Sequence, residues 1–114
     1  MKISELTTEQ GLDVICEIVP FVASIIEDES LAAELQRKLK ITGEASKAEV
    51  YAAGIEKMTK LIPILLKSHR DDVYGIVAAI NGKTAEEVAA QSALKTAAEI
   101  KDIVTDKAFK DFFA

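Results

Sequence analysis

The chain has 114 residues, of which 49% are hydrophobic and 29% are charged, a balance typical of one folded domain and not of a disordered chain. Its formal net charge of −5 argues against nucleic-acid binding as the main role, because such binding depends on neutralising phosphates. The single cysteine excludes an internal disulfide and suits a reducing cytoplasm.

The first helix is predicted to begin at Thr7 or the next residue, since Thr7 and Gln10 have the spacing of a capping box. Pro20 lies inside the segment and should produce a kink, or a junction between two short helices. Ile18 and Ile25 widen the apolar face, which predicts burial on more than one side. The main apolar face is expected to contain the residues that recur at helical spacing: Leu12, Ile15, Cys16, Val19, Val22, Ala23 and Ile26.

A second helix follows "EDES", in which either Asp28 or Ser30 can provide the N-cap. Its leucines recur every four residues: Leu31, Leu35 and Leu39. The helix should end near Lys40. There, Arg37, Lys38 and Lys40 form the densest basic cluster of the chain. We interpret this cluster as a helix C-terminus, where cations suit the helix dipole, in preference to a phosphate site.

The loop "ITGEAS" follows, and Gly43 within it can adopt the left-handed backbone conformation. Ser46 and Glu49 then form a second capping box and open a third helix. Pro63 lies inside this helical pattern and should bend it. The run "LIPILL", residues 61–66, has no polar face and is expected at the centre of the core. The predicted face of the third helix comprises Val50, Tyr51, Gly54, Ile55, Met58, Leu61, Ile62 and Leu65.

A fourth helix is predicted with Ser68 and Asp71 at its start, where the carboxylates of Asp71 and Asp72 favour the positive end of the helix dipole. Asn81-Gly82 should end it as a left-handed C-cap. The same dipeptide is also a hairpin signal, but the flanking apolar residues have a helical period. They are Val73, Tyr74, Ile76, Val77 and Ile80.

Thr84 and Glu87 form a third capping box and begin a fifth helix. Its face is rich in alanine and should pack close to a neighbouring element. The residues on that face are Val88, Ala89, Ser92, Ala93, Ala97, Ile100 and Val104. Thr105 or Asp106 begins a last short helix. This helix carries three aromatic residues on one side: Phe109, Phe112 and Phe113.

Together these patterns predict an all-α fold, in which residues 1–114 form a single compact, bundle-like domain of about five to six helices. No segment shows the period-two alternation of a β-strand. The capping signals and the apolar periods agree with one another along the whole chain, which is why we rest the fold class on them.

Few residues invite a chemical interpretation. His69 with Asp71 and Asp72 could be imagined as a metal site, but residues so spaced at a helix start diverge around the axis, so helix capping is favoured. Cys16 is expected to be a small buried hydrophobe in preference to a nucleophile. The carboxylate pairs lie at predicted helix ends, and no nucleotide-binding or CxxC motif is present. We therefore expect a protein that is not an enzyme, with no catalytic residue, no metal ligand and no cofactor.

The start of the chain, "MKISELTTEQ", lacks the apolar core of a signal peptide. The apolar run at 14–26 is too short to span a bilayer and contains Glu17 and Pro20. We therefore expect a soluble, cytoplasmic protein with neither a membrane nor a nucleic acid as its partner.

Several pieces of the second half occur in a characteristic order. A leucine-rich segment with Leu65-Leu66 precedes an acidic start and "VYGI" (Asp71 to Ile76), then "GKTAEE" (Gly82 to Glu87), then "FKDFF" (Phe109 to Phe113). In this order, the segment from Leu61 to Phe113 resembles the small tail assembly chaperones of long-tailed phages and prophages of Gram-positive bacteria.

This resemblance implies a non-enzymatic protein of the bacterial host cytoplasm. The chain would be the short form of the chaperone, or the N-terminal part shared with a longer, frameshifted form. The short form binds the tail-tube protein, and the longer form also binds the tape-measure protein. Homo-oligomers are compatible with this role. The alternative is a small helical regulatory or adaptor protein of a prophage or bacterium; a DNA-linked factor of that kind would need a basic recognition helix, against which the net charge argues.

The three aromatic residues near the end of the sequence are the candidate partner surface: Phe109, Phe112 and Phe113. Two interpretations remain open. The rings could close the protein's own core, which we favour, or they could remain partly free and contact a partner.

Overall fold

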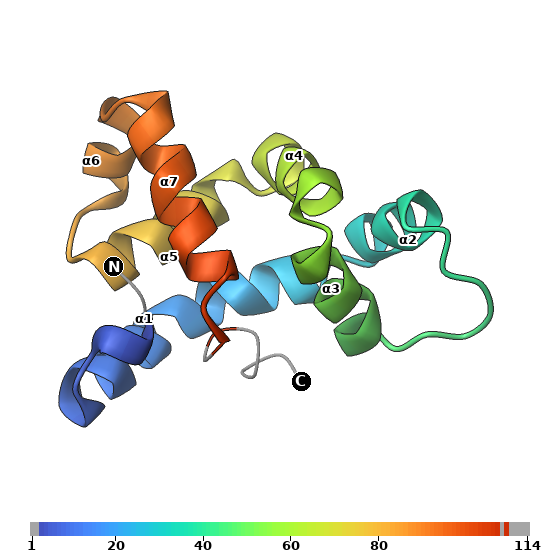
Figure 1. Cartoon of the computed structure of the whole chain (residues 1–114), viewed down its shortest axis with the longest axis horizontal. Helices are drawn as coiled ribbons and strands as arrows, with labels where there is room; N and C mark the ends of the chain where they lie inside the picture. Colours follow the sequence, from blue (N-terminus) through green and yellow to red (C-terminus); the bar gives the residue numbers. More distant parts are fainter. Residues whose placement is uncertain (1–2, 108, 110–114) are drawn as a thin grey trace.

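The computed structural model describes residues 3–107 and residue 109, which form a short 3-10 helix and seven α-helices (Figure 1). No β-strand occurs among these residues, so the predicted all-α class is confirmed. The helix count exceeds the predicted five to six because two of the predicted helices are each divided in the structure.

The 3-10 helix (η1, Ile3–Glu5) precedes α1 (Thr8–Ile26), whose predicted capping box is confirmed. The Gln10 N–H donates to Thr7 Oγ1 at 3.3 Å, and the Thr7 N–H donates to Gln10 Oε1 at 3.2 Å. Helix α1 continues through Pro20, so the alternative of two short helices meeting there is wrong. Buried residues on both sides of Pro20 hold the two halves of α1 against one core, which offsets the one hydrogen bond that proline removes.

The predicted apolar face of α1 is partly wrong. Leu12 is 57% exposed, Val19 is 46% exposed, and Cys16, expected inside, is exposed. The residues of α1 that are buried are Ile18, Val22 and Ile25. Ile18 and Ile25 are predicted only to widen the apolar face and Val22 is one of its members, yet these three residues form the centre of the face that packs on the core. Two overlapping stripes have the same helical period, and packing against other helices decides which one enters the core.

Helix α2 (Glu29–Lys38) begins at Asp28, whose Oδ1 accepts a hydrogen bond from the Leu31 N–H at 3.0 Å. It ends at Leu39, and the next residue, Lys40, has a φ of +57°. The predicted left-handed glycine is confirmed, since Gly43 has a φ of +80°.

Helix α3 (Lys47–Glu56) begins with the predicted capping box of Ser46 and Glu49. The expected single helix then breaks at Lys57, which caps the end of α3 and the start of α4 (Met58–Ser68). Pro63 lies inside α4 and does not end it. The break turns α4 back on α3, so that the methyl groups of Leu61 lie 3.5 Å from the position a Gly54 Cβ would occupy.

Helix α5 (Arg70–Asn81) begins after His69, and no side chain caps its start. The predicted cap at Ser68 is wrong, because Ser68 is the last residue of α4. The predicted stop at Gly82 is confirmed by its φ of +65°. Helix α5 is the central helix and packs on α1, α4, α6 and α7. Its buried residues are Val73, Gly75, Ile76, Val77, Ala78 and Ile80.

The predicted fifth helix is also divided, into α6 (Ala85–Ala90) and α7 (Ala93–Val104). The capping box of Thr84 and Glu87 is confirmed. Ser92 was placed on the helix face, but it is instead the N-cap of α7 and accepts a hydrogen bond from the Lys95 N–H at 3.2 Å. In Figure 1, α6 and α7 lie at one end of the molecule and α2 and α3 at the other.

The beginning and the end of the described chain meet, because the Ser4 N–H donates to Asp106 Oδ2 at 3.0 Å. Asp106 is buried, and Phe109 is 6% exposed within the core. The predicted last helix falls largely outside the described residues, and so do Phe112 and Phe113. No helix of the described part combines the length and hydropathy needed to cross a bilayer.

Helices α1 and α5 approach each other closely at Phe21 and Gly75. A Cβ added to Gly75 would lie 2.5 to 2.7 Å from three carbons of the Phe21 ring, closer than real Cβ contacts allow. The ring therefore rests on bare backbone, and the missing side chain of Gly75 is what lets the longest helix lie against the central one.

Replacing Gly75 with alanine should therefore destabilise the protein, although alanine is the better helix former. Overpacking costs about 1–3 kcal/mol and the gain in helix propensity is about 1 kcal/mol, so we expect urea unfolding to show a net loss of up to about 2 kcal/mol.

Gly11→Ala is the matched control, because a Cβ there would meet only Leu6, at 3.9 Å; it should stabilise slightly. In a Phe21→Leu background the Gly75→Ala change should become neutral or stabilising. Equal effects of the two glycine changes in the wild-type background would contradict the proposed clash.

Candidate functional site

The leucine-rich run of α4 lies between the core and two hollows. Leu61 and Ile64 are buried in the core, at 3% and 4% exposure. The other residues of the run are half-buried or exposed: Ile62, Pro63, Leu65 and Leu66. The expectation that the run lies at the centre of the core is thus only partly right. Because α4 has little polar surface, the sides that the core leaves uncovered line apolar hollows.

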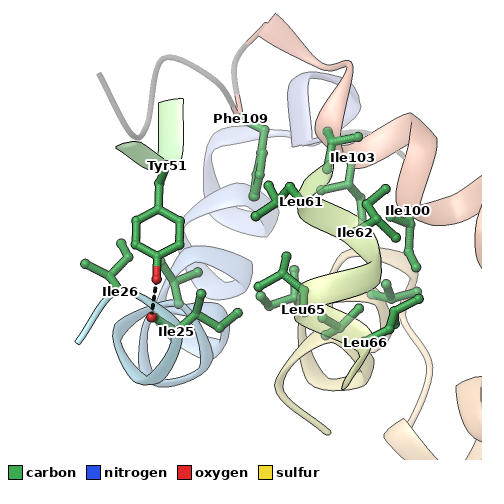
Figure 2. A pocket seen from close by; sticks show the side chains of 15 residues that line it. Ile25, Ile26, Tyr51, Leu61, Ile62, Leu65, Leu66, Ile100, Ile103 and Phe109 are labelled. Atoms are coloured by element: carbon green, nitrogen blue, oxygen red, sulfur yellow. Dashed lines mark hydrogen bonds between the residues drawn. The ribbon is translucent and has the colours of Figure 1, made fainter. Parts of the chain in front are cut away.

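The first hollow is a half-open cavity of about 80 Å³ between α1, α3, α4, α5 and α7 (Figure 2). Its wall is apolar, and the residues labelled in Figure 2 belong to it: Ile25, Ile26, Tyr51, Leu61, Ile62, Leu65, Leu66, Ile100, Ile103 and Phe109. The hydroxyl of Tyr51 donates to the Ile25 carbonyl at 2.7 Å, which satisfies that polar group. Burial, together with the negative charge of Asp28, raises the pKa of Tyr51 to about 12.

Phe109 lines this cavity, facing the α4 leucines in Figure 2. Its 6% exposure is that of a core residue. The position of Phe109 therefore agrees with the interpretation in which the aromatic rings close the protein's own core. The other two rings of the candidate partner surface, Phe112 and Phe113, lie outside the described residues.

The second hollow is a groove of about 320 Å³ between α4, α5, α6 and α7. Its lining is mostly apolar, and it includes Ile62, Leu66, Tyr74, Val88, Ala89, Ala93, Ala97 and Ile100. Arg70, Gln91 and Thr96 contribute polar groups. The alanine face that was expected to pack against a neighbouring element instead stays open: Ala89, Ala93 and Ala97 are exposed. Ile62, Leu66 and Ile100 line both hollows and separate them.

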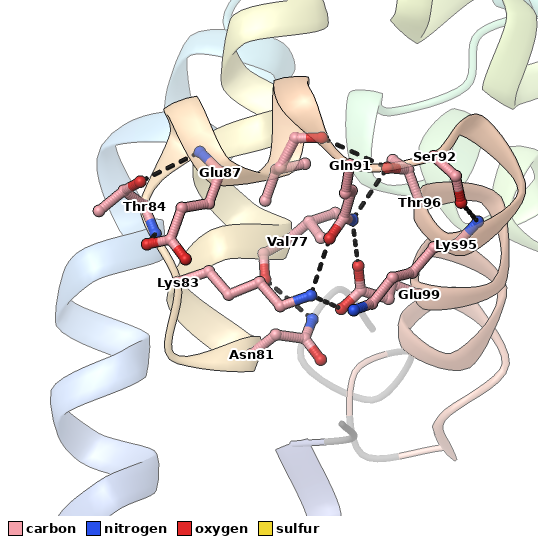
Figure 3. A network of polar contacts seen from close by, with 11 residues as sticks. Val77, Asn81, Lys83, Thr84, Glu87, Gln91, Ser92, Lys95, Thr96 and Glu99 are labelled. Carbon is pink, nitrogen blue, oxygen red and sulfur yellow. Dashed lines mark hydrogen bonds and ion pairs between the residues drawn. The ribbon is translucent and has the colours of Figure 1, made fainter.

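A polar network holds the helices around the groove (Figure 3). Lys83 Nζ donates to Gln91 Oε1 at 2.8 Å and to Glu99 Oε2 at 2.9 Å. Gln91 Nε2 donates to Thr96 Oγ1 at 2.9 Å and also to Glu99. The network therefore joins the loop after α5 to the α6–α7 junction and to α7. The predicted fifth helix breaks at Gln91, whose side chain accepts a hydrogen bond from Lys83 before α6 and donates to Thr96 and Glu99 on α7.

Glu99 is the buried anion of this network, at 9% exposure. Burial alone would raise the pKa of Glu99, but the hydrogen bonds from Lys83 and Gln91 outweigh it and hold the pKa below its ordinary value. Sequence reasoning missed this network. The available signal was that Glu99 lies directly before Ile100 and one helical turn from Ile103, within the apolar series of α7.

A second polar cluster joins α1, α2 and α5. His69 Nδ1 lies 2.7 Å from Asp72 Oδ2, and its Nε2 lies 2.7 Å from Asp28 Oδ2. The Ser24 hydroxyl donates to Asp72 Oδ2 at 2.9 Å. The serine thus contacts the carboxylate and not the imidazole, so these residues are not arranged as a nucleophile with its base. Within the described residues, no three His, Cys, Asp or Glu side chains are placed to hold a metal ion.

The two carboxylates change the titration of this cluster. Burial would lower the pKa of His69, but its hydrogen bonds with Asp72 and Asp28 outweigh burial and raise the pKa above 6.5. The hydrogen bond with His69 lowers the pKa of Asp28. The remaining sequence candidates lie elsewhere: Cys16 is exposed on α1, and Asp71 is exposed in the first turn of α5.

We compared the chain with sequence models of protein families, with curated proteins and with solved structures, and none of the three comparisons gave a match.

The stability of the protein should depend on pH through His69. Since the folded state raises its pKa, protonated His69 stabilises the fold fully below about pH 6.5, and this contribution is lost as the pH rises through the raised pKa. Urea unfolding at pH 6, 7, 8 and 9 should show a falling free energy of unfolding. His69→Gln should flatten the profile, because His69 is the only histidine; an unchanged slope in that variant would argue against this origin.

Lys83→Met should destabilise the protein because it leaves Glu99 buried without its cation. Both side chains retain some exposure, 21% and 11%, so we expect a loss of about 1–3 kcal/mol in urea unfolding. The double variant Lys83→Met, Glu99→Leu should recover part of that loss, since an apolar pair replaces the ion pair. A double variant that is less stable than Lys83→Met would contradict this account.

Proposed function

We propose that the protein is a non-enzymatic tail assembly chaperone, which binds the tail-tube protein or the tape-measure protein during the assembly of a phage tail. One observation carries the proposal. Every residue that lines the groove falls between Ile62 and Ile100, inside the segment Leu61–Phe113 whose sequence resembles that family. The part of the chain with the resemblance is therefore also the part that builds an open apolar surface.

The shape and chemistry of the groove support this role. Exposed alanines on α6 and α7 leave room for the larger side chains of a partner, while Val88 and Ile100 provide a buried apolar floor. Arg70 and Gln91 supply a few polar groups that can orient a bound segment. A surface of this kind can shield an apolar segment of a partner until it assembles.

The polar side chains favour binding over catalysis. His69 and Glu99 are each engaged by neighbouring side chains, which hold helices together. Every buried side-chain nitrogen and oxygen of the described residues has a hydrogen-bond partner. The walls of the cavity and the groove therefore consist mainly of apolar side chains, which suits a protein that acts by binding.

The test is co-expression with the tail-tube protein and the tape-measure protein of the same gene cluster, followed by pull-down. We expect a complex with at least one of them. Ala97→Glu puts a charge into the groove and should weaken that complex about tenfold.

Ala98→Glu is the matched control, because Ala98 is the next residue of α7, is exposed and does not line the groove. It should leave binding unchanged. Absence of a complex with either tail protein would refute the proposal. Binding that responds equally to both alanine changes would remove the groove as its site. A complex with a transcription factor or another regulator of the same locus would instead favour the alternative, a small regulatory adaptor.

A further inference from the structure

The outer side of α1 carries a line of exposed apolar side chains: Leu12, Cys16 and Val19, here called the α1 stripe. They are spaced i, i+4 and i+7, so they lie along one side of the helix. Leu12 and Val19 are 57% and 46% exposed. Single exposed leucines are common on protein surfaces, but a contiguous line with the spacing of helix–helix anchors indicates a contact surface.

The fold itself does not use the α1 stripe. The contacts of α1 with the core are made by Ile18, Val22 and Ile25, and Phe21 adds the contact with α5. The α1 stripe also lies apart from the groove, whose lining contains no residue of α1. It is therefore a second surface, separate from the one that the proposed chaperone function uses.

A row of carboxylates runs beside the α1 stripe. Glu9, Asp13 and Glu17 are all exposed and spaced by four residues. Asp13 and Glu17 each follow a stripe residue, so they are turned about 100° from it around the helix. The sequence of α1 contains no lysine or arginine. One flank of the α1 stripe is thus uniformly negative.

From this pattern we infer that the α1 stripe and its acidic row bind an amphipathic helix of another protein, one whose apolar face is bordered by lysine or arginine. Charge complementarity selects this occupant. A second copy of the chain fits less well, because α1 carries no lysine or arginine that could face the acidic row, and antiparallel pairing would bring acidic row against acidic row. Cys16 lies within the α1 stripe, so its alkylation reports directly on whether the stripe is covered.

The experiment uses two synthetic helical peptides with identical leucines at i, i+4 and i+7, one flanked by lysines and the other by glutamates. At low salt, the lysine peptide should bind the full chain about tenfold more tightly than the glutamate peptide. It should also slow the alkylation of Cys16, and both effects should weaken as salt screens the charges.

Two variants separate the apolar and ionic contributions. Leu12→Gln with Val19→Gln keeps the acidic row and should abolish the protection of Cys16. Asp13→Lys with Glu17→Lys keeps the α1 stripe and should reverse the preference between the peptides. All four positions are exposed, so circular dichroism should show an intact fold.

Leu94→Gln is the matched control, because Leu94 is an exposed leucine of α7, at 84% exposure; it should change nothing. Ala97→Glu, which blocks the groove, should also leave peptide binding intact, so this inference can fail independently of the chaperone function. Equal protection of Cys16 by both peptides would overturn the inference. So would self-association of the free protein that the Leu12→Gln, Val19→Gln variant abolishes, since a second copy would then be the occupant.

Discussion

The contact between the Phe21 ring and the bare backbone of Gly75 sets the distance between α1 and α5, and the other helices arrange themselves around that pair. With α1 this close on one side, α5 buries Ile76, Val77 and Ile80 and leaves its other sides to α4, α6 and α7. The groove forms among those four helices, away from α1. A glycine in the centre of the molecule therefore fixes one side of α5 against α1, and the groove lies on a side away from α1.

The two polar clusters lie at junctions between consecutive helices. His69 is the single residue between α4 and α5, and Gln91 lies at the break between α6 and α7. In both places the chain changes direction, and in both a buried or half-buried polar side chain is satisfied by groups from several elements. Such networks rigidify the junctions because a single lost partner leaves a costly unpaired group. The two helix junctions beside the hollows are therefore held by polar side-chain contacts.

The sequence was most informative where the determining contacts are local, although the local cap predicted at Ser68 is absent and the local cap at Ser92 was missed. The capping boxes at Thr7, Ser46 and Thr84 and the left-handed stop at Gly82 involve groups only a few residues apart, and all are present. The breaks at Lys57 and Gln91 depend on contacts made after the chain has folded, such as that of Leu61 with Gly54. The face of α1 that enters the core likewise depends on packing, because the buried and the exposed apolar residues of α1 recur with the same helical period. The groove was not predicted because an alanine-rich helix face is equally compatible with close packing against a neighbouring helix and with an open groove.

Among the described helices, α4 is the one that combines an uncapped start with an internal proline. No side chain caps its start, and none caps the start of α5 that follows. Pro63 removes one hydrogen bond from its interior, and the half-buried Leu65 and Leu66 line the hollows. Local opening of α4 therefore costs less than that of a capped helix without proline. The α4 part of the wall shared by both hollows is thus held by fewer local hydrogen bonds than a capped helix without proline, so the shape of the cavity and of the groove can adjust there at lower cost.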